Sequence, residues 1–322
     1  MRKLAVGIDI GGTNTVCGMV DREGNIYETF SILTSECKEP LVMVDSLTFK
    51  IKNFLNENSE NFELAGIGIG APNGNYYHGT IEFAPNLPWK GIVELVKLFE
   101  GVFDAPAFLT NDANAAAIGE MVYGGAKDMK DFIMITLGTG CGSAFVANGK
   151  MIYGHDGFAG ELGHTIVFPN GRECGCGRKG CLETYVSASG ITRTVSELLA
   201  NKRDKSELRS IPQEKITSKL IFEAAERGDK IAMEAFNVTS QILGLKLADA
   251  VAYTSPEAIF LFGGLANSGK YIFEPTKMFM EENMLNIFKN KVKILPSQLP
   301  DNNAAILGAS ALVWEQLEAE KY

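Results

Sequence analysis

The chain reads LAVGIDIGGT over residues 4–13, a nearly continuous apolar run that stops at two glycines. The apolar run is typical of a buried strand, and a second apolar segment from Thr15 to Val20 predicts the other half of a hairpin. Glycines in such a turn let the backbone approach a phosphate group and point N–H groups at it. Asp9, at the end of the strand, could hold the hydration shell of Mg²⁺, an ion that keeps several of its waters.

The same pattern returns later in the chain. A strand is expected over residues 132–137, a turn at Gly138-Thr139-Gly140, and a second strand over residues 142–147. An internal repeat of this kind favours a fold of two similar halves that face a shared cleft. A third apolar strand, residues 258–262, ends in Gly263-Gly264. One such turn would equally fit a plain hairpin, but three at the ends of apolar strands favour nucleotide binding.

The glycine turns match neither of two common nucleotide-binding motifs. The sequence has no Gly-x-x-x-x-Gly-Lys-Ser/Thr, which excludes a P-loop protein. No Gly-x-Gly-x-x-Gly opens a helix after a strand, which argues against a dinucleotide-dependent oxidoreductase.

The composition is that of a globular protein with an acidic balance. The 322 residues carry 30 Lys and Arg against 39 Asp and Glu, a net charge of −9. This balance argues against a nucleic-acid partner and against attraction to an anionic membrane surface. No uncharged apolar run is long enough to predict a membrane span, and Asp9 interrupts the first apolar run too early for a signal peptide. We therefore expect a cytoplasmic protein with no nucleic-acid or membrane partner.

Strands and helices alternate between and after the two hairpins, which predicts a mainly parallel or mixed sheet flanked by helices. Further strands are expected over residues 64–70, 107–110, 258–262 and 292–295. Helices are expected over residues 41–58, 91–99, 187–201, 218–227, 230–253, 275–288 and 303–318, and from Asn111 or Asp112 onward.

A candidate general base follows a short strand, in Thr110-Asn111-Asp112-Ala113-Asn114. A carboxylate at a strand end can accept the proton of a substrate hydroxyl as that oxygen attacks phosphorus. Asn111 would donate hydrogen bonds to, and accept them from, neighbouring hydroxyls of a small polyol. The structural alternative is that Asp112 merely caps the helix.

Three cysteines lie close together after a histidine, in the set His164, Cys174, Cys176 and Cys181. One imidazole and three thiolates form a complete ligand set for a closed, structural zinc site. The alternatives are a disulfide with one free thiol, or three unrelated thiols. Since four protein ligands leave no position for water, the expected role of the zinc is to fix the loop that binds it.

Other acidic residues and cysteines take their interpretation from this loop. Glu161 and Glu183 flank the expected metal ligands and are candidate acceptors for sugar hydroxyls, although exposed loop residues would look the same. The other cysteines, Cys17, Cys37 and Cys141, are expected to be small buried residues without a site role.

Together these motifs resemble those of the ROK family of repressors and sugar kinases. The motifs are Asp9-Ile-Gly-Gly-Thr13, Asn111-Asp-Ala-Asn114, Leu137-Gly-Thr-Gly140, Glu161-Leu-Gly-His164 and Cys174-Gly-Cys-Gly-Arg-Lys-Gly-Cys-Leu-Glu183. They occur in the family's order, and Gly263-Gly264 and Ala304-Ala-Ile-Leu-Gly308 extend the match to nearly the whole chain.

The resemblance implies an α/β protein with the actin-like ATPase (ribonuclease H-like) fold, in which two α/β domains lie around a central cleft. The smaller domain would comprise residues 1–112 and a C-terminal helix at 304–322, and the larger domain residues 113–303 with the zinc-binding loop. The resemblance also implies a homodimer or a dimer of dimers. The implied activity is ATP-dependent phosphorylation of the C6 hydroxyl of glucose in glycolysis, with N-acetylmannosamine, N-acetylglucosamine or fructose as alternative substrates.

Carried over by position, the resemblance gives each motif a role. Asp112 would be the catalytic base, and His164 would touch both zinc and sugar through opposite edges of its ring. The sugar contacts would be Asn86, Asn111, Asp112, Glu161, His164 and Glu183. The zinc ligands would be His164, Cys174, Cys176 and Cys181. The region for ATP and Mg²⁺ would comprise Asp9, Gly11, Gly12, Thr13, Gly138, Thr139, Gly140, Gly263 and Gly264.

The sequence departs from the family pattern at one place and leaves two other functions to weigh. Many family members have Pro-Gly where this chain has Ala71-Pro72-Asn73-Gly74, beside the expected sugar site. A sugar-responsive repressor would carry a DNA-binding domain ahead of the first hairpin, for which no room is expected before Leu4. A sugar-binding protein without catalysis is the other alternative, and the intact Asp112 argues against it.

Overall fold

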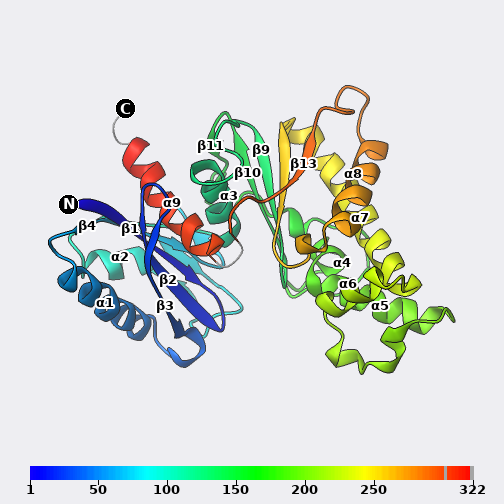
Figure 1. The fold of residues 1–322 in the computed structure, drawn as a ribbon, viewed down its shortest axis with the longest axis horizontal. Helices are drawn as coiled ribbons and strands as arrows, with labels where there is room; N and C mark the ends of the chain where they lie inside the picture. Colours follow the sequence, from blue (N-terminus) through cyan, green and yellow to red (C-terminus); the bar gives the residue numbers. More distant parts are fainter. Residues whose placement is uncertain (301–302, 320–322) are drawn as a thin grey trace. The chain divides into compact units, whose positions relative to one another are not determined.

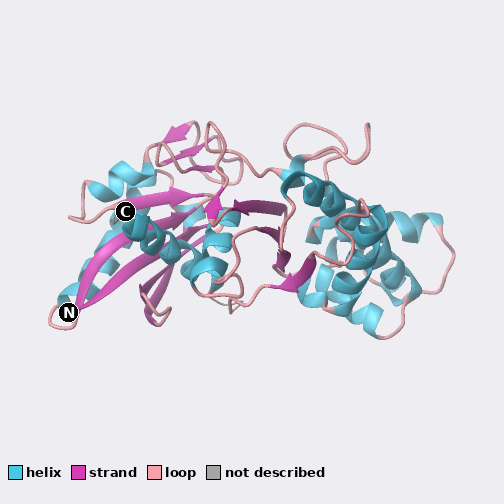
Figure 2. Ribbon diagram, turned by 90° about the horizontal axis from the view of Figure 1, so that it is seen from above, coloured by secondary structure: helices cyan, strands magenta, loops and turns pink. Residues whose placement is uncertain are grey.

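The computed structural model describes residues 1–300 and 303–319, which form two compact α/β units (Figures 1 and 2). The first unit comprises residues 1–129, 151–159 and the chain from Gln298 onward. The second unit comprises residues 130–150 and 160–297. Each unit is built on a five-stranded sheet.

The sheet of the first unit has the strand order β3-β2-β1-β4-β8. Strands β1, β2 and β3 are antiparallel, and β4 and β8 continue the sheet in parallel with β1. Their bounds are β1 (Arg2–Ile10), β2 (Asn14–Asp21), β3 (Ile26–Leu33), β4 (Phe62–Gly70) and β8 (Ala107–Thr110). A small separate sheet consists of β5 (Gly74–Asn75), β6 (Thr80–Glu82) and β7 (Ile92–Val93).

The two faces of this sheet differ in the size of their side chains. On one face, large apolar residues such as Ile8 and Ile67 pack against α1 (Pro40–Glu57) and α2 (Leu95–Glu100). On the other face, α9 (Ala304–Ala319) lies on β1 and β4, and α3 (Asp112–Val122) packs against α9. Figure 1 shows the red C-terminal helix beside the blue N-terminal strands.

Glycine residues in the strands make the close approach of α9 to the sheet possible. A Cβ atom at Gly7 of β1 would lie 2.2 Å from the carbonyl oxygen of Ile306. A Cβ atom at Gly68 of β4 would lie 1.9 Å from the carbonyl oxygen of Ala309. Because successive side chains of a strand point to opposite faces, alternation of glycine with isoleucine gives one smooth face and one bulky face.

The second unit repeats this sheet, with the strand order β11-β10-β9-β12-β13. In both units the central strand is the first strand of a hairpin and pairs on its other side with a parallel strand, so the predicted internal repeat is confirmed. The strands are β9 (Phe132–Leu137), β10 (Cys141–Ala147), β11 (Lys150–Met151), β12 (Ala258–Phe262) and β13 (Lys293–Pro296). The helices are α4 (Glu183–Val186), α5 (Ala188–Asn201), α6 (Ser218–Glu226), α7 (Lys230–Thr254) and α8 (Lys270–Asn283).

Several expected elements differ from the observed ones. Strand β3 was not expected, although its residues alternate in polarity as a half-exposed strand does. Helix α2 begins at Leu95 rather than at residue 91. Helix α8 begins at Lys270, five residues before the predicted start at Pro275, because Ile272 is fully buried and anchors an earlier turn. It ends at Asn283 rather than at residue 288.

The boundary between the units also differs from the predicted one at residue 112. Helix α3 belongs to the first unit because it packs on α9 and β4, so the chain leaves this unit after Met129. Residues 151–159 and the segment from Gln298 to the start of α9 also belong to the first unit. The end of the predicted C-terminal helix, residues 320–322, lies outside the described residues.

Among the helices of the described ranges, none combines the length and the apolar character that a bilayer span requires.

The glycine face of the first sheet predicts a specific sensitivity to a single methyl group. Gly68→Ala would force α9 away from β4, and we expect it to lower the free energy of unfolding by about 3 kcal/mol. Gly101→Ala is the matched control, since its Cβ would lie 3.3 Å from its nearest neighbour, the carbonyl oxygen of Lys97. Urea unfolding followed by circular dichroism measures both, and equal midpoints for the two variants would contradict the prediction.

Candidate active site and metal centre

The predicted phosphate turn of the first unit joins β1 to β2 through residues 11–13. The N–H of Gly11 donates to the carbonyl oxygen of Asn14 at 2.9 Å, which closes the turn. A Cβ atom at Gly12 would lie 2.5 Å from the carbonyl oxygen of Asn86, so the loop that carries Asn86 passes directly over this turn. Thr13 and the side chain of Asn86 are exposed, as groups that meet a ligand must be.

Two carboxylates approach each other at the carboxyl ends of β1 and β8. Between them lies Gly70, whose Cβ would be 3.8 Å from Oδ1 of Asp9 and 3.9 Å from Cα of Asp112. Burial, and secondarily the charge of Asp112, raise the pKa of Asp9 to about 6. Asp112 keeps an exposed surface, yet the protein around it removes enough water for burial to raise its pKa, against a backbone hydrogen bond from Ala113.

The cap of helix α3 is Asn111 and not Asp112. Oδ1 of Asn111 accepts a hydrogen bond from the N–H of Asn114 at 2.7 Å. This bond occupies one of the two acceptor positions of the amide oxygen, and the amide nitrogen is the group through which Asn111 can donate to a ligand. The carboxylate of Asp112 is not used as the cap, which keeps it available as a base.

The departure at Asn73 has a conformational explanation. Asn73 has φ of +52°, in the left-handed region where glycine is favoured and asparagine is the most readily accepted alternative. Its Nδ2 donates to the carbonyl oxygen of Glu82 at 3.0 Å. Asparagine can therefore hold this turn in the left-handed region, and its side chain adds one hydrogen bond.

In the second unit, two glycine turns lie at the carboxyl ends of neighbouring strands. The carbonyl oxygen of Gly138 accepts from the N–H of Ala188 at 2.8 Å, and the carbonyl oxygen of Thr139 accepts from Oγ of Ser189 at 3.0 Å. These bonds dock the turn after β9 onto the start of α5. A Cβ atom at Gly138 would meet no protein atom within 4 Å, so a ligand could approach this backbone closely.

The turn after β12 is built against the same strand. Gly263 has φ of +102°, and its Cβ would lie 2.8 Å from the carbonyl oxygen of Leu137, so only glycine fits. The next residue, Gly264, has open space where its Cβ would stand. The turns at Gly138 and Gly264 thus both leave room for a ligand beside their backbone.

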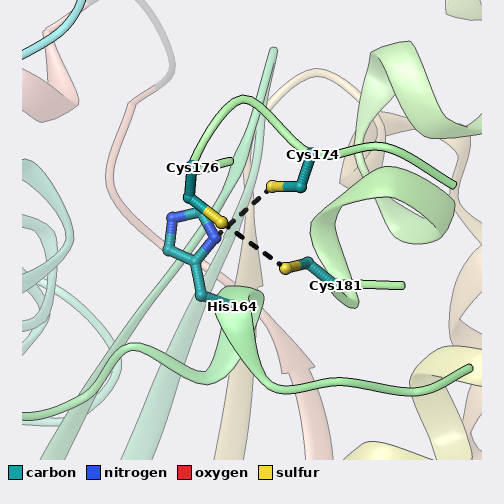
Figure 3. A group of neighbouring side chains, drawn as sticks. All are labelled: His164, Cys174, Cys176 and Cys181. Carbon is teal, nitrogen blue, oxygen red and sulfur yellow. Dashed lines mark hydrogen bonds between the residues drawn. The ribbon is translucent and has the colours of Figure 1, made fainter. Parts of the chain in front are cut away.

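The four predicted metal ligands come together in the second unit, as Figure 3 shows. Their ligand atoms all lie within 4.8 Å of one another. The Sγ atoms of Cys176 and Cys181 are 3.7 Å apart, and Sγ of Cys174 is 3.7 Å from Nδ1 of His164. A tetrahedral zinc with Zn–S bonds of about 2.3 Å needs sulfur–sulfur edges of about 3.8 Å. The cluster of His164, Cys174, Cys176 and Cys181 is therefore compatible with a structural zinc ion.

The two glutamates beside the cluster have different surroundings. Oε2 of Glu183 accepts from the N–H of Cys141 at 3.0 Å, and its Oε1 lies 3.7 Å from Sγ of Cys174. Glu183 thus ties the metal cluster to the glycine turn that ends at Gly140, a contact that the sequence did not predict. Glu161 is exposed, and its Oε2 lies 4.0 Å from Nε2 of His164. His164 therefore turns one ring edge to the cysteines and the other to Glu161.

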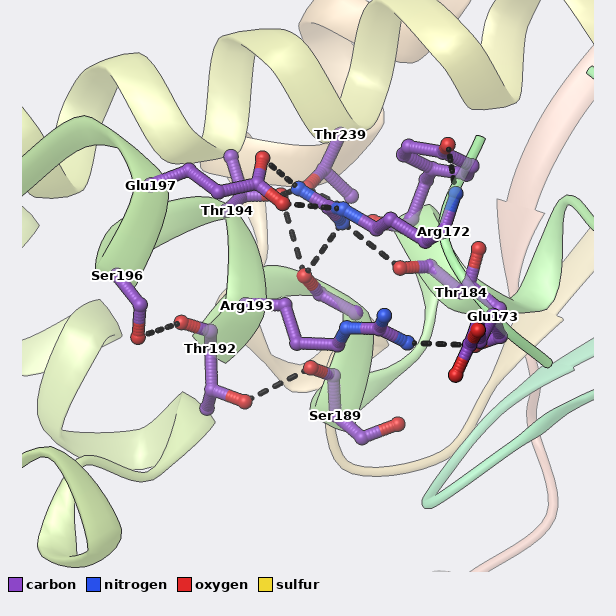
Figure 4. A network of polar contacts seen from close by, with 12 residues as sticks. Arg172, Glu173, Thr184, Ser189, Thr192, Arg193, Thr194, Ser196, Glu197 and Thr239 are labelled. Carbon is purple, nitrogen blue, oxygen red and sulfur yellow. Dashed lines mark hydrogen bonds and ion pairs between the residues drawn. The ribbon is translucent and has the colours of Figure 1, made fainter. Parts of the chain in front are cut away.

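Arg172 lies within the metal-binding loop and ties it to α4 and α5, a role that the sequence did not predict (Figure 4). Its guanidinium donates to both carboxylate oxygens of Glu197, to the hydroxyl of Thr194, and to the carbonyl oxygens of Thr184 and Gly190. All five of its N–H donors are used. The group also lies over the ring of Tyr185, with 4.4 Å between the guanidinium carbon and the ring centroid.

The cysteines outside the cluster fit their predicted passive role. Cys17, Cys37 and Cys141 are buried and unpaired. Burial raises the pKa of Cys141 to about 12, which keeps this thiol neutral and unreactive.

Comparison with known proteins shows similarity along nearly the whole chain. The model of the ROK family matches residues 5–316. A glucokinase from Streptomyces coelicolor is 32% identical over 318 residues, which cover 97% of this chain and 98% of the relative. A xylose repressor from Bacillus subtilis is 28% identical, over 96% of this chain and 76% of the repressor.

Solved structures confirm the predicted fold. The crystal structure of a ROK family glucokinase from Streptomyces griseus, in complex with glucose and AMPPNP, has a TM-score of 0.78 and 31% identity. The similarity covers 97% of this chain and 99% of that one. The two α/β units described above therefore have the actin-like ATPase fold.

The cysteine cluster predicts that zinc is bound and that Cys176 contributes to it. Cys176→Ser removes one of four ligands, so zinc affinity should fall by more than the roughly 10–100-fold that follows loss of an outer-shell partner. Elemental analysis and a chelator titration of the purified protein measure this. Cys37→Ser is the matched control, because its thiol donates to the carbonyl oxygen of Leu33 and a hydroxyl can do the same. Unchanged zinc content in Cys176→Ser would contradict the assignment.

The carboxylate pair predicts a stability difference that depends on pH. A raised pKa in the folded state means that ionised Asp9 costs stability above about pH 6, and that this cost disappears as the group binds a proton at lower pH. Asp112→Asn removes the neighbouring charge and should stabilise the protein by about 1–2 kcal/mol at pH 8. The gain should shrink towards pH 5. Urea midpoints across this range test it, with Asp104→Asn, an exposed site, as the control; a gain that does not vary with pH would contradict it.

Proposed function

The chain belongs to the ROK family, and we propose that it is an ATP-dependent hexose kinase that phosphorylates the C6 hydroxyl of glucose. The observation that carries this proposal is Asp112, an exposed carboxylate of raised pKa at the start of α3. The similar proteins named glucokinase, and the glucose and AMPPNP bound in one of them, support the choice of glucose and ATP.

Asp112 is the proposed general base. Its carboxylate takes the proton of the C6 hydroxyl, and that oxygen attacks the γ-phosphorus of ATP as the bond to the leaving ADP breaks. A pKa above the ordinary value makes this carboxylate a stronger base. Since Asn111 and not Asp112 caps the helix, this proton transfer does not compete with helix capping.

The glycine turns are the proposed phosphate-binding elements. In the first unit, Gly11, Gly12 and Thr13 offer backbone and hydroxyl groups, and Asp9 would hold the hydration shell of Mg²⁺. When bound, this ion supplies positive charge against the phosphates. In the second unit, the proposed nucleotide contacts are Gly138, Thr139, Gly140, Gly263 and Gly264. The open space beside Gly138 and Gly264 supports this role.

The proposed sugar contacts come from both units of the chain. Asn86 and Asn111 would bind hydroxyls from the first unit, and Glu161, His164 and Glu183 from the second. Because Glu183 already accepts the N–H of Cys141, it would serve the sugar with its remaining acceptor capacity. Zinc would act on this set indirectly, since it fixes the loop between His164 and Cys181 and performs no step of the reaction.

The alternative substrates are other hexoses, and the alternative function is sugar sensing. N-acetylmannosamine, N-acetylglucosamine and fructose differ from glucose by a substituent or ring form, so a panel of sugars must include them. The similarity to xylose repressors keeps a non-catalytic sugar sensor as the second candidate. The ionisable pair of Asp9 and Asp112 favours the kinase, because a sensor needs no base of raised pKa.

We further propose that the protein works in the cytoplasm as a homodimer or dimer of dimers, with a sugar and no nucleic acid or membrane as its partner. The net charge of −9 supports the absence of a nucleic-acid partner.

The kinase proposal predicts sugar-dependent release of ADP from Mg-ATP. We expect turnover with glucose, and a loss of about 10²–10⁴-fold in kcat for Asp112→Asn with glucose binding retained. Coupled ADP assays against a sugar panel, with calorimetry for binding, measure this; Asp104→Asn is the control. Turnover with an N-acetylated sugar would change the substrate and keep the mechanism. Tight sugar binding without turnover in the unaltered protein would instead establish the sensor.

A further inference from the structure

A buried carboxylate that none of the proposed binding or catalytic steps uses lies near the end of α3. Glu120 is fully buried, and its two oxygens accept three backbone N–H groups. Oε2 accepts from Gly125 at 2.6 Å, and Oε1 accepts from Gln298 at 2.7 Å and from Leu299 at 3.3 Å. Bonds from N–H groups to an ionised carboxylate are stronger than bonds between neutral groups.

The position of these partners in the chain gives the contact its meaning. The chain leaves the first unit after Met129, re-enters it for residues 151–159, and returns to it for the last time at Gln298. One side chain therefore holds the outgoing connection, through Gly125, and the returning connection, through residues 298 and 299. The carbonyl oxygen of Glu120 also accepts from the N–H of Ala126 at 3.1 Å, which strengthens the hold on the outgoing connection.

We propose that Glu120 is a positioning residue that fixes both of these connections to α3 and so defines where the two units pivot. Helix α3, to which Glu120 fixes the two connections, packs rigidly against α9. A Cβ atom at Gly119 would lie 3.0 Å from Cα of Gly308, and one at Gly308 would lie 2.6 Å from the carbonyl oxygen of Ala115. Helices α3 and α9 thus meet backbone to backbone at these glycines.

The outgoing connection is also held on the side of the second unit. Oε1 of Glu257 accepts from the N–H of Lys130 at 2.9 Å and from that of Asp131 at 3.3 Å. The outgoing chain is thus held by Glu120 at residues 125 and 126 and by Glu257 at residues 130 and 131, which leaves residues 127–129 between the two anchors. Residues 151–159 are held to the first unit as well, since Nδ2 of Asn75 donates to the carbonyl oxygen of Asp156 at 2.9 Å and the hydroxyl of Tyr77 donates to that of Gly154 at 3.0 Å.

The consequence for the proposed reaction follows from the rigidity of one helix. Asp112 begins α3 and Glu120 lies eight residues later, about 12 Å along the same helix. The base and the pivot therefore keep a fixed separation while the units move. Loss of the hydrogen bonds of the Glu120 carboxylate would leave the surroundings of Asp112 unchanged. It would make closure of the units less reproducible, which lowers kcat.

Substitution of Gly124 is a second, independent way to disturb the hydrogen bonds of the Glu120 carboxylate. A Cβ atom at this position would lie 2.0 Å from Oε2 of Glu120. Gly124→Ala therefore displaces the carboxylate without removing it, whereas Glu120→Gln keeps the shape and replaces an acceptor oxygen by a donor that faces N–H groups. The matched controls are Asp21→Asn, a buried carboxylate that accepts backbone N–H groups of its own turn, and Gly101→Ala.

Residue-resolved hydrogen exchange tests the hydrogen bonds of Glu120 without reference to any activity. In the unaltered protein the amides of residues 125, 298 and 299 should exchange as slowly as those of α3. Glu120→Gln and Gly124→Ala should accelerate these amides about tenfold or more and leave α1 and β4 unchanged, and neither control should do so. Exchange at the rate of exposed loops in the unaltered protein, or a uniform acceleration over the first unit in the variants, would overturn the proposal. If Glu120→Gln does not fold, the unaltered protein and Gly124→Ala still decide.

A kinetic test rests on the proposed kinase function. Glu120→Gln should lower kcat about tenfold while the sugar KM and the acidic limb of the pH profile stay as in the unaltered protein. A shifted acidic limb would mean that the substitution reaches Asp112 and would overturn the positioning role. If no variant and no unaltered protein turns over any sugar, the kinase proposal fails, and the exchange measurement alone judges the positioning role of Glu120.

Discussion

The structure of the first unit depends on direct contact between the backbone of α9 and strands β1 and β4. Gly7 and Gly68 make this contact, because any Cβ at either position would overlap a helix carbonyl oxygen. With α9 seated on the sheet, α3 packs on α9 and starts where β8 ends. Gly70 continues the same glycine row to the end of β4, where it leaves room for Asp9 and Asp112 to approach each other. One row of missing side chains therefore shapes both the fold and the candidate catalytic pair.

Carboxylates in this protein divide into two kinds according to their partners. Glu120 and Glu183 accept backbone N–H groups, which satisfies their charge and makes them structural ties. Asp9 and Asp112 lie near each other, and burial raises the pKa of each. A raised pKa makes each carboxylate a stronger base than an ordinary one, as general base catalysis requires. Asp112 also accepts the N–H of Ala113, but that donor is its own neighbour in the chain, whereas donors to Glu120 and Glu183 come from other segments.

The sequence predicts what depends on neighbouring residues and misses what depends on distant ones. Both hairpins and the cluster of His164 with three cysteines follow from local patterns. The cap role of Asn111, the tie made by Glu183 and the five bonds of Arg172 require backbone groups from other segments to be placed first. The place of α3 in the first unit needs distant residues for the same reason, because only the packing of α3 on α9 assigns that helix to this unit. We expect sugar specificity to belong to this second class, since in the proposed site it would depend on loops such as the one that carries Asn86.

Helix α3 unites these features in a short, alanine-rich segment. Its residues Ala113 to Glu120 are all buried, so the helix cannot shift without disturbing its contacts with α9 and the sheet. Its first residue is the proposed base, and its buried glutamate holds the two connections to the second unit. Small side chains are needed because the neighbouring backbones are so close, and close packing in turn gives the helix its rigidity. A kinase that must bring a base and a phosphate donor together repeatedly would gain from this arrangement, because the proposed positioning residue and the proposed base belong to the same closely packed helix.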